Sequence, residues 1–273
     1  RMESRRMQYS GVAWFAGPWL GLFLWEEVDA RLPFIISTLS AAGMLAYFWY
    51  LRLGTQQVIA RARSRSANPL RAVRRYIQQP ALKIAYGITL SRSSFWVAMF
   101  VFGPIYALDA GLPAWVAGAL LSGVSALMFL SPVVRRAADR FGTRQVIIFG
   151  LGLTAVAMFS LAALGAPRPA GLVFWVLAAL GGAMLDVLGN IPFMRLVRPR
   201  ERAEMTVVFS TWREVSELLT PALAAAVLIV APFWGLYVVL GVMHCAAMAS
   251  ALGASPWVDL AGYAAGMGCQ NVD

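Results

Sequence analysis

Residues 113–165 read PAWVAGALLSGVSALMFLSPVVRRAADRFGTRQVIIFGLGLTAVAMFSLAALG. Two apolar runs, near residues 113–134 and 146–165, flank a short segment that holds all the charged residues of this stretch. A helix of about 20 apolar residues, rising 1.5 Å per residue, crosses the hydrocarbon core of a bilayer. The stretch therefore predicts two transmembrane helices joined by a basic turn.

The composition of the whole chain agrees with a membrane protein. Hydrophobic residues make up 60% of the 273 residues and charged residues only 13%, which leaves too little polar surface for a soluble domain of this length. The apolar runs are continuous and too long for strands. We therefore predict an all-α integral membrane protein with eight transmembrane helices, near residues 9–27, 33–51, 83–107, 113–134, 146–165, 170–194, 206–230 and 233–254.

The basic residues predict how these helices are oriented. If eight spans alternate, 19 of the 23 Lys and Arg residues fall on one side of the membrane, and the connections on the other side hold only Arg31 and Arg168. The positive-inside rule makes the basic side cytoplasmic, as expected for a multi-pass protein of a plasma (inner) membrane. A net charge of +10 arranged in this way favours a lipid bilayer over nucleic acid as the partner.

The connection over residues 54–80 is the longest between predicted spans. Its first part is basic and rich in Ser and Ala, as in a flexible linker. Asn68 can cap a helix that has Pro69 in its first turn. One face of this helix holds Leu70, Val73, Tyr76 and Ile77. We therefore predict a basic cytoplasmic linker that ends in an amphipathic helix on the membrane surface.

The charged segment between the two runs quoted first has a recognisable spacing. Residues 135–145 read RRAADRFGTRQ, which resembles the loop signature of the major facilitator superfamily, Gly-x-x-x-Asp-Arg-x-Gly-x-Arg-Arg. Arg135 replaces the leading glycine and Gln145 replaces a second base. The matching residues are Asp139, Arg140, Gly142 and Arg144.

The resemblance implies that this loop latches one conformation of a rocking transporter. Glycine permits the tight turn between two helices. The carboxylate of Asp139 can accept hydrogen bonds from a helix N-terminus or pair with an arginine. A basic turn with no gating role is the alternative interpretation.

The first predicted span contains a second spacing that resembles this superfamily. Residues 13–21 read AWFAGPWLG and are similar to the helix-five signature of its proton-coupled antiporters, Gly-x-x-x-Gly-Pro-x-x-Gly-Gly. Gly17, Pro18 and Gly21 match, whereas Ala13 and Leu22 replace the first and last glycines. Small residues at this spacing let helices approach closely, and proline kinks the span. The resemblance implies export by antiport, and ordinary small-residue packing is the alternative.

The layout of the chain also resembles the superfamily, whose members join two six-helix bundles by a long cytoplasmic loop. On this mapping residues 1–53 are helices five and six, residues 54–80 are the linker and residues 81–256 are the six-helix C-terminal bundle. Residues 257–273 are expected to form a disordered tail. The mapping implies a partial fold, that is, a fragment that covers helices five to twelve. The missing N-terminal helices of the parent chain are then its expected partner.

Ionisable residues inside the predicted spans are candidates for a substrate or proton pathway. Charges at membrane depth are costly, so they tend to face a cavity or one another. Arg92 lies nine residues after Lys83, and Asp186 lies nine residues before Arg195. Both are therefore expected about 13 Å inside the basic end of their helices.

Further polar residues lie near the same depth. Arg213 and Glu217 are four residues apart, so they share a helix face and can pair, and Asn190 adds a hydrogen-bonding group. The family's architecture implies that Arg92 and Asp186 line the central cavity. There Arg92 can bind an anionic group or balance Asp186, and Asp186 or Glu217 can carry a proton. A static salt-bridge network is the alternative.

Together these features predict a secondary active transporter that works by alternating access about a midplane site. The expected mode is proton-coupled efflux of a small amphipathic substrate. Uptake by symport and a non-transporting scaffold or receptor are the alternatives. A membrane enzyme is not expected, because the sequence has no metal-ligand cluster, no nucleophile with a base and no nucleotide loop. Accordingly, no catalytic residue, cofactor or metal is predicted. Without helices one to four, the chain alone is expected not to transport.

Overall fold

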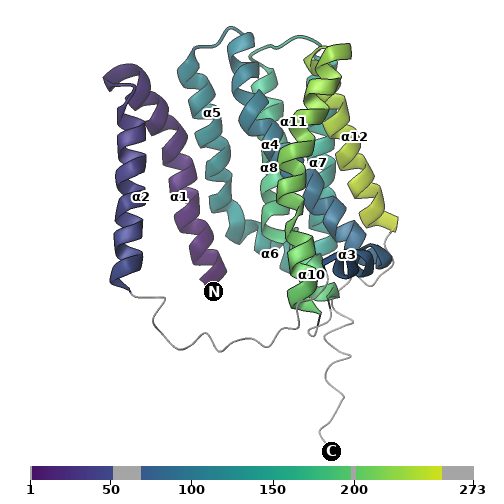
Figure 1. Cartoon of the computed structure of the whole chain (residues 1–273). Coiled ribbons are helices and arrows are strands. Elements are labelled where there is room, and N and C mark those ends of the chain that lie inside the picture. Colours follow the sequence, from purple (N-terminus) through teal and green to yellow (C-terminus); the bar gives the residue numbers. More distant parts are fainter. Residues whose placement is uncertain (1, 52–68, 198–200, 254–273) are drawn as a thin grey trace, which may run out of the picture.

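The computed structural model describes residues 2–51, 69–197 and 201–253, and every regular element in these ranges is helical. Helices α1 (Met2–Phe23) and α2 (Leu32–Tyr50) form an antiparallel pair joined by a π-helical turn at Leu24–Val28, and they stand beside the main bundle (Figure 1). The main bundle consists of α4 (Pro80–Asp109), α5 (Ala114–Ala126), α7 (Thr143–Ala163), α8 (Gly171–Leu188), α11 (Trp212–Val230) and α12 (Phe233–Gly253). Shorter helices complete its lower end in Figure 1: α3 (Pro69–Gln78), α6 (Ser131–Phe141), α9 (Ile191–Leu196) and α10 (Arg202–Ser210).

Six segments of the described chain are long and apolar enough to cross a membrane: Leu32–Tyr50, Pro80–Asp109, Ala114–Phe141, Thr143–Ala163, Gly171–Leu196 and Phe233–Gly253. Helices also form at the other two predicted spans, 9–27 and 206–230. The first turns of α11 hold three charged residues, Arg213, Glu214 and Glu217, and α1 contains Gly, Pro and Trp residues of low hydropathy. The all-helical class is thus confirmed, and the count of eight spans stays a prediction.

The segment 135–145, expected to be a loop, is mostly helical. A short 3₁₀ turn at Leu127–Leu130 follows α5, and α6 then runs to Phe141 with proline in its first turn. Proline suits a first turn because its missing N–H would be unbonded there in any case. Only Gly142 separates α6 from α7. The sequence interpretation placed the turn too early, because it ended the helix where the apolar run ends.

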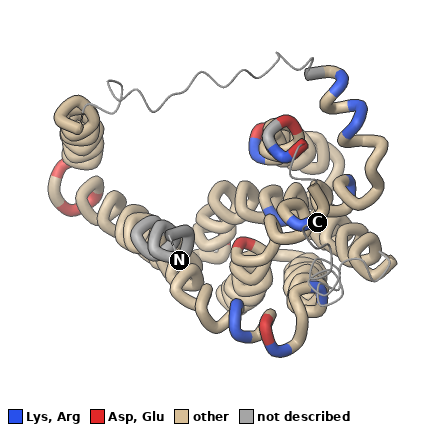
Figure 2. The backbone as a smooth tube through the Cα atoms, turned by 90° about the horizontal axis from the view of Figure 1, so that it is seen from below, with Lys and Arg blue, Asp and Glu red and all other residues tan. Residues whose placement is uncertain are grey.

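Most basic residues of the described chain lie at one end of the bundle, whereas Arg31 and Arg168 lie in turns at the other end. Figure 2, seen from below, shows Lys and Arg on the helices and turns at this end. The connections at the opposite end include the turn after α4 and the turn between α7 and α8 (Figure 1). This arrangement is the one that alternating spans require.

Helix α8 lies against both α7 and α4 because two neighbouring glycines face them. A Cβ atom at Gly182 would lie 3.0 Å from the ring of Phe95 on α4, and one at Gly181 would lie 2.5 Å from the carbonyl oxygen of Gly150 on α7. Above these glycines Trp175 is fully buried against Phe95 and other rings. In lipid the hydrophobic effect does not hold helices together, so close packing of small residues does. This packing fixes the position of α8, and with it the position of the charged residue that α8 carries.

Helix α3 packs under the bundle through only part of its predicted apolar face. Ala72 and Tyr76 are buried, whereas Leu70, Val73 and Ile77 are exposed. The hydroxyl of Tyr76 donates a hydrogen bond to the carbonyl of Leu82, 2.9 Å away. Burial, and then the neighbouring Tyr86, raise the pKa of Tyr76 above its ordinary value, so this hydroxyl remains a donor. The exposed apolar residues suit a membrane surface, which stays a prediction.

Two predicted segments fall outside the described residues. They are the flexible part of the linker, with the capping residue Asn68, and the tail at residues 257–273. The proposed boundaries of the domains are therefore untested at both places.

Candidate functional site

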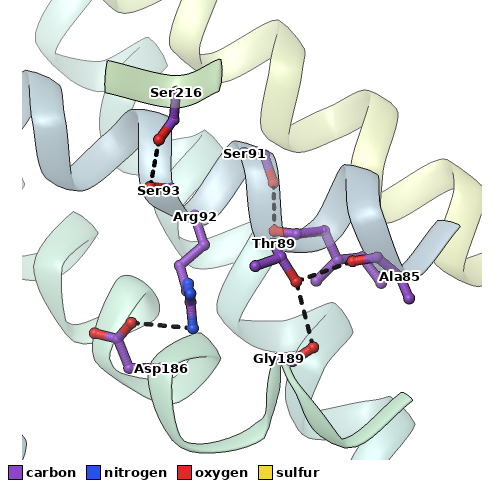
Figure 3. Close-up of polar contacts among 9 residues, drawn as sticks. Ala85, Thr89, Ser91, Arg92, Ser93, Asp186, Gly189 and Ser216 are labelled. Carbon is purple, nitrogen blue, oxygen red and sulfur yellow. Dashed lines mark hydrogen bonds and ion pairs between the residues drawn. The ribbon is translucent and has the colours of Figure 1, made fainter. Parts of the chain in front are cut away.

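The two charges expected at equal depth meet inside the bundle. The guanidinium Nη1 of Arg92 on α4 lies 3.3 Å from Oδ1 of Asp186 on α8 (Figure 3). The side chains are 7% and 20% exposed, respectively. Because the pair is mostly buried, removing one partner leaves an uncompensated charge.

Arg92 is held in place by an aromatic ring as well as by its counter-ion. Its guanidinium carbon lies 4.8 Å from the centre of the Trp212 ring, and the guanidinium of Arg213 approaches the same ring at 5.6 Å. Cations are attracted to the negative face of an indole. The Nε atom of Arg92 is buried and has no hydrogen-bond partner among the described residues. Arg92 therefore has one donor that these residues leave unpaired in this conformation.

A serine pair sets the position of α11 relative to α4. The hydroxyl oxygens of Ser93 and Ser216 are 2.6 Å apart (Figure 3). Ser216 donates its hydrogen to the carbonyl of Arg213, 2.8 Å away, so Ser93 is the donor within the pair. This link holds the first turns of α11, with Trp212 and Arg213, beside Arg92.

A cavity of about 770 Å³ lies between α1, α4, α5, α8 and α11, and its lining includes the Arg92–Asp186 pair. Its charged residues are Arg92, Asp186, Arg213 and Glu217. Its apolar walls include the rings of Trp14, Trp96, Phe100 and Trp212. A mostly apolar cavity with a few converging polar groups is the usual form of a small-molecule site.

Arg213 and Glu217 share the cavity, but they do not form an ion pair in the part of the chain that the structure describes. Both side chains are exposed, and Arg213 faces Trp212 instead. Asn190 lies elsewhere. It lines a second cavity of about 720 Å³ at the basic end, together with Asp186. Asp186 therefore borders both cavities.

The aromatic walls are the part of the site that sequence reasoning missed. Trp96 is one helical turn beyond Arg92, and Trp212 directly precedes Arg213. Residues four apart lie on the same face of a helix, so this spacing was available as a signal for Trp96. No comparable signal exists for Trp14, because it reaches the cavity from α1, far away in the sequence.

Gly142 and Arg144 of the predicted latch loop shape the junction of α6 with α7 and its contact with α12. Gly142 adopts φ 92° and ψ 138°, a backbone conformation open to glycine but costly for other residues. This conformation lets the chain turn at Gly142, the single residue between α6 and α7. Arg144 then donates hydrogen bonds to the carbonyls of Ala251 and Leu252, at 3.2 Å and 2.8 Å. Those carbonyls belong to the last turn of α12, where the helix dipole is negative.

The other two latch residues, Asp139 and Arg140, make no hydrogen bond or ion pair to another helix among the described residues. The carboxylate of Asp139 has no hydrogen bond or ion pair within the described ranges, and it lines the second cavity. The guanidinium of Arg140 lies 5.3 Å from the centre of the Phe141 ring. A latching role for these residues therefore stays a proposal.

We expect Arg144→Gln to lower the free energy of unfolding by about 1–2 kcal/mol, because two charge-assisted hydrogen bonds to the end of α12 are lost. The thermal unfolding midpoint of the detergent-solubilised chain measures this. Arg140→Gln is the matched control, since it removes an equal charge that makes no such bonds, and it should change stability by less than about 0.5 kcal/mol. Equal effects of the two variants would contradict the capping role.

The small residues of the antiporter-like spacing do not pack against another helix in the described chain. A Cβ atom at Gly17 or Gly21 would meet nothing within 4 Å, and Ala13 is exposed. Helix α1 instead approaches α5 at Gly118, where a Cβ atom would lie 3.1 Å from Leu22 and 4.0 Å from the carbonyl oxygen of Pro18. The antiport interpretation of this motif is therefore untested.

Comparison with known families gives one result. Residues 124–256 match the family model described as Major Facilitator Superfamily. The matched region contains the latch loop, Asp186 and the whole of α11 and α12. No curated protein and no solved structure matches the chain.

Proposed function

We propose that the chain is a membrane transporter of the Major Facilitator Superfamily, whose family model matches residues 124–256. It moves a small amphipathic molecule across the membrane by alternating access, coupled to protons and in the direction of efflux. In this proposal all eight predicted helices cross the membrane, including α1 and α11. The proposal places the basic end of the bundle in the cytoplasm of a plasma membrane. Helices one to four of the superfamily fold have no counterpart in this mapping, and they would complete the cavity wall.

The observation that carries the proposal is the Arg92–Asp186 ion pair inside an aromatic-walled cavity. Ionisable groups at membrane depth usually serve an ion or substrate pathway. The rings of Trp96, Phe100 and Trp212 offer apolar surface for the body of an amphipathic molecule. The buried pair offers charge to its polar end.

The same pair can couple substrate to proton. The ion pair requires an ionised Asp186, so protonation of that carboxyl group and the contact with Arg92 exclude each other. A substrate group that pairs with either partner also breaks the contact. Proton binding and substrate binding thus both break the contact between Arg92 and Asp186. Because they act on the same contact, the affinity for one depends on whether the other is bound, as exchange of substrate for proton requires.

Proton flux measured in liposomes tests this function. The transporter, extended by the four leading helices that the resemblance implies, is reconstituted with a pH-sensitive dye inside. A proton gradient is imposed, and a panel of amphipathic compounds and small metabolites is added. We expect at least one compound to dissipate the gradient, with proton movement opposite to substrate movement.

The outcomes separate the alternatives. Proton and substrate moving in the same direction would favour uptake by symport. Substrate movement without proton movement would contradict coupling, and no movement of any compound by folded protein would favour a non-transporting scaffold or receptor.

A further inference from the structure

The second cavity lies at the basic end and has a composition unlike the first. It lies between α6 on one side and the end of α8 with α9 on the other, and its volume is about 720 Å³. We call it the vestibule. Its lining includes three arginines, Arg135, Arg136 and Arg195, together with the carboxylates of Asp139 and Asp186. Figure 2 shows basic and acidic residues gathered at this end of the bundle.

The charges of the vestibule do not cancel. Asp186 is already paired with Arg92 at 3.3 Å, so its charge is balanced from the other cavity. Asp139 alone then faces three arginines. None of these three guanidinium groups has a hydrogen bond, an ion pair or an aromatic contact within the ranges that the structure describes. An excess of positive charge with unused donors therefore remains in a partly open cavity.

Guanidinium groups suit a particular kind of anion. Their planar fork binds two oxygens at once, so arginines that converge from two sides of a cavity favour phosphate. The hydroxyl of Ser131 and the amide of Asn190 also line the vestibule and can donate to the remaining oxygens. The excess of about two charges matches that of a phosphate monoester near pH 7.

We propose that the vestibule is a binding site for a phosphate group, held between Arg135 and Arg136 of α6 and Arg195 of α9. The site is separate from the aromatic-walled cavity and binds its ligand whether or not the protein transports. Both the headgroup of an anionic phospholipid and a soluble phosphate carry this chemistry. Since the ligand bridges α6 and α9, its binding also stabilises the arrangement in which these helices lie close together.

Thermal unfolding of the 273-residue chain tests the site with two probes. In detergent, inorganic phosphate is titrated against chloride at equal ionic strength. In nanodiscs, phosphatidylcholine alone is compared with phosphatidylcholine containing phosphatidic acid. We expect a saturable rise of the unfolding midpoint with at least one probe. Stabilisation by phosphate in detergent assigns a soluble ligand, and stabilisation by phosphatidic acid alone assigns a lipid.

The variants distinguish a built site from general positive charge. The triple variant Arg135→Gln, Arg136→Gln, Arg195→Gln should lose the stabilisation. The single variant Arg195→Gln, at an exposed position, should fold normally and bind about tenfold more weakly. The matched control is Arg71→Gln, Arg74→Gln, Arg75→Gln, which removes three exposed charges from α3 at the same end of the bundle.

We expect the α3 variant to keep the full response. An equal loss in both triple variants would overturn the proposal, because the effect would then come from the overall charge of this end. The proposal also fails if neither probe shifts the midpoint of the unaltered chain, or if Arg195→Gln binds as tightly as that chain does. None of these results depends on transport, so this site and the proposed function can fail independently.

Discussion

Asp186→Asn is expected to lower proton-driven flux by about 100-fold or more, because the variant keeps the shape of the side chain but cannot release or take up a proton. The dye assay in liposomes measures the loss. Substrate binding in detergent should persist, since the aromatic walls of the cavity are unchanged. A variant that loses coupling while it still binds substrate identifies Asp186 as the proton carrier.

The Asp186→Asn substitution also breaks the ion pair, so its effect on stability must be separated from its effect on coupling. Asp186→Asn leaves Arg92 buried without its counter-ion, which by itself costs about 3–5 kcal/mol of stability. The double variant Arg92→Gln, Asp186→Asn removes both charges and should recover most of that stability. If Asp186 carries the proton, the double variant stays uncoupled although it is well folded. If coupling returns with stability, the pair is a structural salt bridge and the proposal is wrong.

Glu217→Gln is the comparison on the same cavity. This carboxylate is exposed and has no ion-pair partner among the described residues, so its loss should change stability by less than about 0.5 kcal/mol. A drop in coupling at this position alone would move the proton-carrying role from Asp186 to α11. Full coupling in both single variants would exclude both carboxylates.

The depth of the Arg92–Asp186 pair was predictable from the sequence. Each residue is nine positions from a basic residue near the basic end of its helix, Lys83 or Arg195. Helical rise turns that spacing into equal depth, and the cost of an isolated charge at that depth implies a partner. The sequence offered the pairing of Arg92 with Asp186 as one possibility, beside binding of an anionic group by Arg92, and it did not decide between them.

Other features depended on contacts between distant parts of the chain. Trp14 lines the cavity only because α1 packs beside α5, and no local pattern encodes that. Asp139 was assigned to a loop because the apolar run ends before it. A helix can continue past the end of an apolar run, and α6 does so up to Phe141. Hydropathy locates the membrane and not the end of the helix.

The position of Asp186 between two cavities joins the two proposals. On one side it holds Arg92 among aromatic rings, and on the other it borders the vestibule with its three arginines. A proton that reaches Asp186 from the basic end passes through the vestibule. A phosphate group bound there would place negative charge beside Asp186, which favours the protonated carboxyl group. Occupancy of the vestibule is therefore expected to favour the state in which Arg92 is released.

This arrangement depends on how closely α8 lies against α7, and Gly181→Ala is expected to disturb it most. The added Cβ atom would lie 2.5 Å from the carbonyl oxygen of Gly150 and would also overlap the hydroxyl of Thr154. That hydroxyl is fully buried and shares its single hydrogen between the carbonyls of Gly150 and Ala178, at 3.0 Å and 3.1 Å. Overpacking of this kind costs about 1–3 kcal/mol, and the hydrogen bonds lost from Thr154 add to it.

The thermal unfolding midpoint in detergent measures this loss, with Gly123→Ala on α5 as the control. A Cβ atom at Gly123 would meet nothing within 4 Å, so alanine there should be neutral or stabilise by up to about 1 kcal/mol through helix propensity. The double variant Gly181→Ala, Thr154→Ala should recover only part of the loss, because the clash with the Gly150 backbone remains.

Gly181 precedes Asp186 by five residues, about 7.5 Å along the helix. A shift of α8 away from α7 therefore also changes the distance between Asp186 and Arg92, and the variant should lose coupled flux even when it folds. Unfolding at the midpoint of the unaltered chain, or full recovery in the double variant, would show that the two helices can separate at no cost.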